Sequence, residues 1–145
     1  MGLRPRYNAR DIAIYVSHVI ANAEKTILDV LRSEGKAFVD DAKGMTYAEG
    51  GFRDNTGVLR SSIGFYLFAK STLIEEYFEG EPEGKVAADQ AVDTIPRING
   101  YQLIGIAGAD YAAEVESRGL NVITVQSTIA LVNIRTHLLR ATRGL

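Results

Sequence analysis

The chain has 145 residues, 46% of them hydrophobic and 23% charged, which is ordinary for a soluble globular protein. Its 16 basic and 18 acidic residues leave a net charge of −2, so no overall charge favours binding to nucleic acid or a membrane surface. The absence of cysteine excludes disulfides, thiolate catalysis and cysteine-rich zinc sites. The apolar stretches are far shorter than the roughly twenty residues of a membrane span, and the length favours one domain over residues 1–145.

Residues 8 to about 43 are predicted to form one long helix, with Asn8 as its N-cap and Gly44 as its stop. Apolar residues recur at steps of three and four, at Ile12, Val16, Val19, Ala23, Ile27, Val30 or Leu31, and Phe38. Gly35 is a candidate bend. About 35 residues span roughly 50 Å as a helix, which is longer than a domain of this size needs.

Residues 44–57 contain four glycines and no periodicity, and they are predicted to form a long loop. Three large side chains in this loop are costly to leave in water, namely Met45, Tyr47 and Phe52. They pack either against the protein's own core or on a neighbouring subunit, and the sequence leaves both interpretations open. Asn55 or Thr56 is then placed to cap a short helix that runs through Ser61.

The rest of the chain alternates strands and helices. Residues 63–69 are apolar on both faces, as in a central or interface strand, and residues 72–78 are predicted to pair with them antiparallel. A helix at about 84–95, stopped by Pro96, precedes a strand at 101–107. The fold class that follows is α+β, with a small, mainly antiparallel sheet.

Two further helices complete the prediction. The first covers residues 110–118, opened by Asp110 and closed by Gly119. The second runs from Thr124, its expected cap, to about 142. Its apolar residues cover a wide arc, which predicts burial on two sides.

Charge is unevenly distributed along the chain. Arginines mark both ends, at Arg4, Arg6 and Arg10 and at Arg135, Arg140 and Arg143. The middle is acidic, at Glu75, Glu76, Glu79, Glu81, Glu83, Asp89 and Asp93. This pattern describes either solvated faces or electrostatic complementarity between copies of the chain.

The sequence lacks a convincing catalytic set. His18 and His137 lie in separate helices, and no metal-binding histidine motif is present. One loose group of carboxylates remains as a minor alternative metal site, namely Asp54, Asp110, Glu114 and Glu116. We therefore expect no enzyme activity, no cofactor and no metal.

Two segments carry a resemblance to a known family. The first signature runs from Asp54 to Gly64 and reads Asp-Asn-Thr-Gly-Val-Leu-Arg-Ser-Ser-Ile-Gly. The second signature runs from Ala107 to Glu116, shortly before Gly119. Together they resemble the tail-completion, or head–tail joining, proteins of tailed bacteriophages, although Val58 stands where that family often has Asn.

This resemblance implies a structural virion protein of the phage neck or tail top, made in the host cytoplasm. Such a protein assembles as a ring of its own copies between the portal or head-completion adaptor and the tail tube or tail terminator. DNA passes through the lumen without sequence-specific binding, and no membrane is involved. The residues carrying the signature are Asn55, Thr56, Gly57, Leu59, Arg60, Tyr111, Val115, Glu116 and Gly119.

Charge and exposure predict the contacts between subunits. The candidates are Met45, Tyr47, Phe52, Glu75, Glu76, Glu79, Arg135 and Arg140. Within the subunit, Arg60 is predicted to pair with Glu116. Two competing hypotheses stay open: a small ligand-binding or hydrolytic domain with a carboxylate-lined pocket near Arg60, Tyr111 and Glu116, and a regulatory module that uses the basic last helix.

Overall fold

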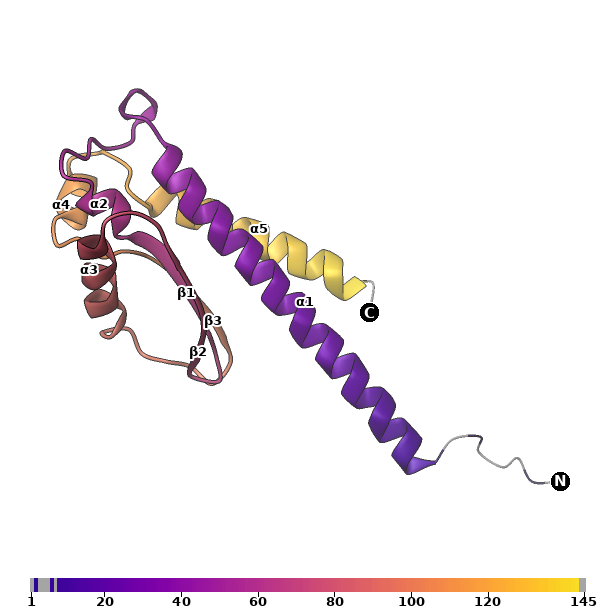
Figure 1. The fold of residues 1–145 in the computed structure, drawn as a ribbon. Coiled ribbons are helices and arrows are strands. Elements are labelled where there is room, and N and C mark those ends of the chain that lie inside the picture. The colour runs from indigo at the N-terminus through magenta and orange to yellow at the C-terminus, as the bar shows by residue number, and fades with distance from the viewer. Residues whose placement is uncertain (1, 3–5, 7, 144–145) are drawn as a thin grey trace.

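A three-stranded antiparallel sheet forms the centre of the fold (Figure 1). In the computed structural model, which describes residues 2, 6 and 8–143, β1 (Ile63–Ala69) lies between β2 (Thr72–Phe78) and β3 (Tyr101–Ala107). The predicted strands are confirmed, and β1 is the central one. Its side chains are buried on both faces up to Phe68, which explains why the sequence pattern there is apolar throughout.

Helices cover the two faces of this sheet, so the subunit has three layers (Figure 1). On one face, α1 (Ala9–Gly44) packs Phe38 and Val39 against Phe65 and Leu67 of β1, and α5 (Thr124–Arg143) lies beside α1. On the other face, α3 (Pro82–Val92) contributes Ala88 and Val92 to a second apolar cluster. The sheet contributes Tyr66, Phe68, Ile104 and Ile106 to it. The expected α+β class is confirmed.

The long helix α1 begins and ends where the sequence predicts. Asn8 Oδ1 accepts from the Asp11 N–H at 2.9 Å, and Asp11 Oδ2 accepts from the Asn8 N–H at 3.2 Å, which forms a capping box. Gly35 does not mark a bend. It is buried where α1 crosses the sheet, and a Cβ there would lie 2.9 Å from the Phe65 ring, so glycine permits a close approach of helix and strand.

α1 is much longer than the helix that lies beside it. Its 36 residues span roughly 54 Å, whereas the 20 residues of α5 span roughly 30 Å. Figure 1 shows α1 continuing well past the end of α5. Residues 9–22, which we call the arm, are all exposed. The predicted N-terminal arginine cluster includes Arg4, which lies outside the described residues.

Several predicted helix ends are wrong in detail. α3 spans Pro82–Val92 rather than 84–95, because Pro82 occupies the first turn, where its missing N–H costs nothing. α4 spans Ala112–Ser117, and Asp110 does not cap it, since Tyr111 stands at the N-cap without a side-chain hydrogen bond. A short 3-10 helix, η1 (Tyr47–Glu49), interrupts the predicted loop.

Within the described part of the chain, no helix is both long enough and apolar enough to cross a bilayer.

Candidate functional site

The first signature builds the short helix α2 (Val58–Ser61) and its connection to β1. Asp54 is the main cap of α2, because its carboxylate accepts from the Gly57 N–H at 2.9 Å and the Arg60 N–H at 2.7 Å. Of the two predicted caps, Thr56 contributes one longer bond, in which its hydroxyl accepts from the Val58 N–H at 3.4 Å. Gly57 enters the helix with a φ of 78°, a left-handed conformation that favours glycine. A single carboxylate therefore satisfies two free donors at the helix start.

Arg60 fastens the end of α1 to the loop that follows it. Its guanidinium donates to the carbonyl oxygens of Lys43 and Phe52, and it lies 4.8 Å above the Phe52 ring. The Lys43 carbonyl belongs to the last turn of α1, where carbonyls lack a helical partner and a cation is favourable. Arg60 thus stabilises a chain reversal rather than presenting a charge to a ligand.

The predicted ion pair between Arg60 and Glu116 is wrong. Glu116 instead accepts from the N–H groups of Ile123 at 2.9 Å and Thr124 at 3.0 Å, and from the Thr124 hydroxyl at 2.7 Å. It therefore caps the start of α5, the role predicted for Thr124 itself. Partial burial opposes ionisation of Glu116, but these hydrogen bonds outweigh it and lower the pKa of the carboxyl below its usual value.

The two signatures meet at Ser62. Its hydroxyl donates to the Leu59 carbonyl at 2.8 Å and accepts from the Ala109 N–H at 3.1 Å, while its own carbonyl accepts from the Gly108 N–H. Ser61 likewise accepts from the Glu81 N–H at 2.7 Å. Sequence reasoning missed these two serines, because a hydrogen bond to a distant backbone group leaves no local pattern. Both are buried structural residues.

The remaining signature residues have different environments. Leu59 is completely buried, and Val115 packs against the main core. Tyr111 does not share that packing, since 39% of it is exposed. Gly119 follows α4 in a left-handed conformation, as a helix end favours.

The loop after α1 sorts its three large side chains into separate environments. Phe52 is buried in the main core, so the prediction that it contacts a neighbouring subunit is wrong. Met45 is partly buried, and its sulfur lies 3.4 Å from the Asn121 amide. Tyr47 is exposed, with the Arg53 guanidinium 4.4 Å above its ring. Of these three, Tyr47 is the side chain most available to a partner.

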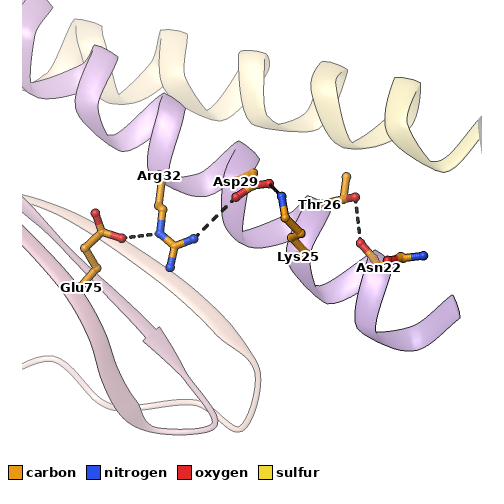
Figure 2. Close-up of polar contacts among 6 residues, drawn as sticks. All are labelled: Asn22, Lys25, Thr26, Asp29, Arg32 and Glu75. Carbon is orange, nitrogen blue, oxygen red and sulfur yellow. Dashed lines mark hydrogen bonds and ion pairs between the residues drawn. The ribbon is translucent and has the colours of Figure 1, made fainter. Parts of the chain in front are cut away.

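The predicted acidic contacts on β2 and just after it bind other groups of the same subunit. Glu75 binds Arg32 of α1, as Figure 2 shows. Glu79 accepts from the Tyr77 hydroxyl at 2.6 Å, which raises the pKa of Tyr77 to about 12.

Glu76 belongs to a charged cluster with α3. Its carboxylate lies 3.2 Å from the Lys85 ammonium, which also binds Asp89. The Tyr66 hydroxyl donates to Asp89 at 2.6 Å, and burial together with this acceptor raises the pKa of Tyr66. Reversing these β2 charges therefore disturbs the subunit as well as any interface.

The outer surface of α5 is apolar and exposed. We expected this helix to be buried on two sides, but in the subunit it is covered on one side only, by α1 and the sheet. The exposed apolar residues are Val125, Ile129, Leu131, Val132 and Leu139. Arg135 and Arg140 are exposed on the same helix.

The arm of α1 is also apolar and exposed. Its large apolar side chains are Ile12, Ile14, Tyr15, Val16, Val19 and Ile20. In the part of α1 that follows the arm, the side facing away from α5 is charged. Figure 2 shows Lys25, Asp29 and Arg32 on this side. The arm and the outer side of α5 are thus two separate apolar surfaces on one subunit.

The pocket expected between Arg60, Tyr111 and Glu116 is not formed by these residues. The cavity beside Glu116 has a volume of about 220 Å³ and is lined by Gly119, Leu120, Asn121 and Thr124. The four loosely grouped carboxylates do not converge either: Asp54 and Glu116 cap helices, and Glu114 binds Arg118. Among the residues that the structure describes, no three histidine, aspartate or glutamate side chains lie close enough together to hold a metal ion.

Comparisons of the chain with protein-family models, curated proteins and solved structures found no match. The resemblance to phage proteins accordingly rests on the two signatures alone.

Proposed function

We propose that the protein is a structural subunit of the neck or tail top of a tailed bacteriophage. It assembles as a ring that joins the portal or its adaptor to the tail. The observation that carries the assembly in this proposal is the arm, because residues 9–22 extend past the end of α5 and expose six large apolar side chains. Exposed apolar surface of this extent is typical of an interaction site.

The arrangement of exposed surfaces favours a ring over a symmetric pair. A ring interface is heterologous, so each subunit needs two different patches that complement each other. The arm and the outer side of α5 are two such patches, on different helices of one subunit. The two signatures add the class of assembly, since they resemble those of head–tail joining proteins.

The partners that follow from this role are copies of the chain, the portal or adaptor above it, and the tail tube or tail terminator below it. DNA passes through the lumen, and a net charge of −2 is compatible with passage without tight binding. The protein is made in the host cytoplasm and ends in the virion.

The competing ligand-binding or hydrolytic hypothesis has weaker support. It required Arg60 and Glu116 to face a shared pocket, but Arg60 donates to backbone carbonyls and Glu116 caps α5. Neither group is then available to bind a substrate.

Deletion of the gene from a phage genome that carries it tests the proposed function. The expected result is a lysate of separate DNA-filled heads and complete tails, seen by negative-stain electron microscopy. Expression of the protein in the host should restore joined, infectious particles. Joined particles in the absence of the gene contradict the proposal.

A further inference from the structure

One half of the arm's surface is free of charge. Successive helical residues are rotated by about 100°, so Ile12, Val16 and Val19 share one stripe. The charged residues of the arm, Arg10 and Asp11, fall on the opposite half together with His18. Ile14 also falls opposite the stripe, although its exposure of 49% matches the 46% of Val16.

The arm's apolar stripe continues the surface that α5 covers deeper in the subunit. Following the same rotation along α1, the stripe passes through Ala23 and Val30 to Glu34. Glu34 is buried there, and its carboxylate lies 2.7 Å from His137 of α5. The arm therefore presents the face of α1 that already packs on α5, at a point where α5 has ended.

The outer side of α5 has a matching stripe. Val125, Ile129, Val132 and Leu139 share one face, at steps of four, three and seven. Arg135 and Arg140 flank this stripe on its two sides, and residues 124–143 contain no carboxylate. The exposed stripe from Val125 to Leu139 is roughly 21 Å long, and the 14 residues of the arm also span roughly 21 Å.

We propose that the arm of one copy packs lengthwise on the outer stripe of α5 in the next copy. This inference rests on the proposed ring assembly and names its contact. The arm stripe steps by four and three residues, and the α5 stripe keeps the same spacing with the polar Thr136 between Val132 and Leu139. This average of 3.5 residues is the spacing at which two helices interlock their side chains in a coiled coil. In the assembly, α5 then lies between α1 of its own subunit and the arm of the neighbour, and the three helices form one layer.

Charge decides between this contact and a symmetric one. Pairing α5 with α5 of another copy would bring Arg135 and Arg140 toward the same arginines, with no carboxylate on either helix to offset them. The uncharged half of the arm meets α5 without that repulsion. The contact therefore joins two different surfaces, as ring closure requires.

Disulfide cross-linking tests this contact directly, because the natural chain has no cysteine. Val16→Cys is placed in the arm and Val132→Cys in α5. A disulfide between these two positions of one subunit is excluded by distance. Glu34 of α1 contacts His137 of α5, and Val16 lies 18 residues, or roughly 27 Å, from Glu34 along α1. Mild oxidation of an equal mixture of the two proteins, dissociated and reassembled together, should give a cross-linked dimer, and the double variant should give a ladder of longer species.

Ile14→Cys, mixed with Val132→Cys, is the matched control for exposure on the opposite face of the arm. We expect at least tenfold less cross-linked dimer from this mixture. Equal cross-linking in both mixtures overturns the inference, and so does cross-linking of Val16→Cys alone, which would indicate arms that pair with each other.

Light scattering of the natural protein separates the two proposals. Absence of the Val16–Val132 cross-link while the natural protein is a ring overturns this contact and leaves the ring standing. Absence of the cross-link together with a monomeric natural protein overturns the contact and also removes the support that the arm lends to the ring.

Discussion

The side chains of the two signatures and those of the two long helices differ in where they find their contacts. Around α2 and α4, the polar groups of Asp54, Arg60, Ser62 and Glu116 all bind backbone groups within the subunit. On the arm and the outer side of α5, large apolar side chains are exposed to solvent. The recognisable residues therefore hold the fold, whereas the surface available for assembly carries no recognisable motif.

This difference gives the residues of reactive type in the two signatures a structural role. Turns between helices and strands expose backbone donors and acceptors that must be paired when they are buried. Asp, Ser, Arg and Glu satisfy them, and the same side chains would otherwise be read as a catalytic or ligand-binding set. The following substitutions test the contrast between the signature region and the helical surfaces.

The largest loss of stability is expected in the buried part of the first signature. Leu59→Ala removes a completely buried side chain from the main core and should lower the free energy of unfolding by about 2–5 kcal/mol. Urea denaturation followed by circular dichroism measures this loss. A change below about 0.5 kcal/mol, the usual limit for surface sites, would show that α2 is not part of the core.

Arg60→Ala should have the next largest effect. The substitution leaves the carbonyls of Lys43 and Phe52 without their charged donor, which costs about 1.5–3 kcal/mol. Arg60→Lys should recover little of this, because an ammonium cannot reproduce the planar fork of a guanidinium. Full recovery by lysine would indicate that only charge matters at this position.

Glu116→Ala should cost about 1–2 kcal/mol, as expected for loss of a helix cap. Glu116→Gln should reveal the pH dependence. Because folding lowers the pKa of Glu116, its charge stabilises the native state above the usual value near 4.5, and that contribution is lost as the pH falls through the folded pKa. The stability difference between the natural protein and Glu116→Gln should shrink between pH 5 and pH 3; a constant difference contradicts this role.

The smallest effect on folding should accompany the largest effect on assembly. Val16→Asp and Val132→Asp lie at exposed sites, so each should change subunit stability by less than about 0.5 kcal/mol. Each should nevertheless dissociate the assembly, because an unpaired carboxylate enters an apolar contact. Ile14→Asp, on the opposite face, should leave the assembly mass unchanged. Light scattering distinguishes these outcomes, and dissociation by Ile14→Asp as well would mean that the whole arm is buried.

The long helices and the strands were readable in the sequence, since each has a clear period or a clear stop. α1 begins after Asn8 and ends at Gly44, and β1, β2 and β3 have their predicted bounds. The contacts between elements were less accessible. The Arg60 partner was assigned from charge alone, whereas the actual acceptors are backbone carbonyls, which every residue has.

Burial was the other limit. Phe52 and Tyr47 lie five residues apart in the same loop, and only the folded chain separates the buried ring from the exposed one. The apolar arc of α5 predicted burial on a second side of the helix, in addition to the side that packs on α1. In a single subunit that side is open to solvent.

The molar mass of the purified natural protein at micromolar concentration, measured by light scattering with negative-stain images of the same sample, tests the central claim most directly. The account predicts closed rings with a mass that is a whole multiple of 15.8 kDa. A monomer that stays monomeric in the presence of the purified portal complex and tails would contradict it.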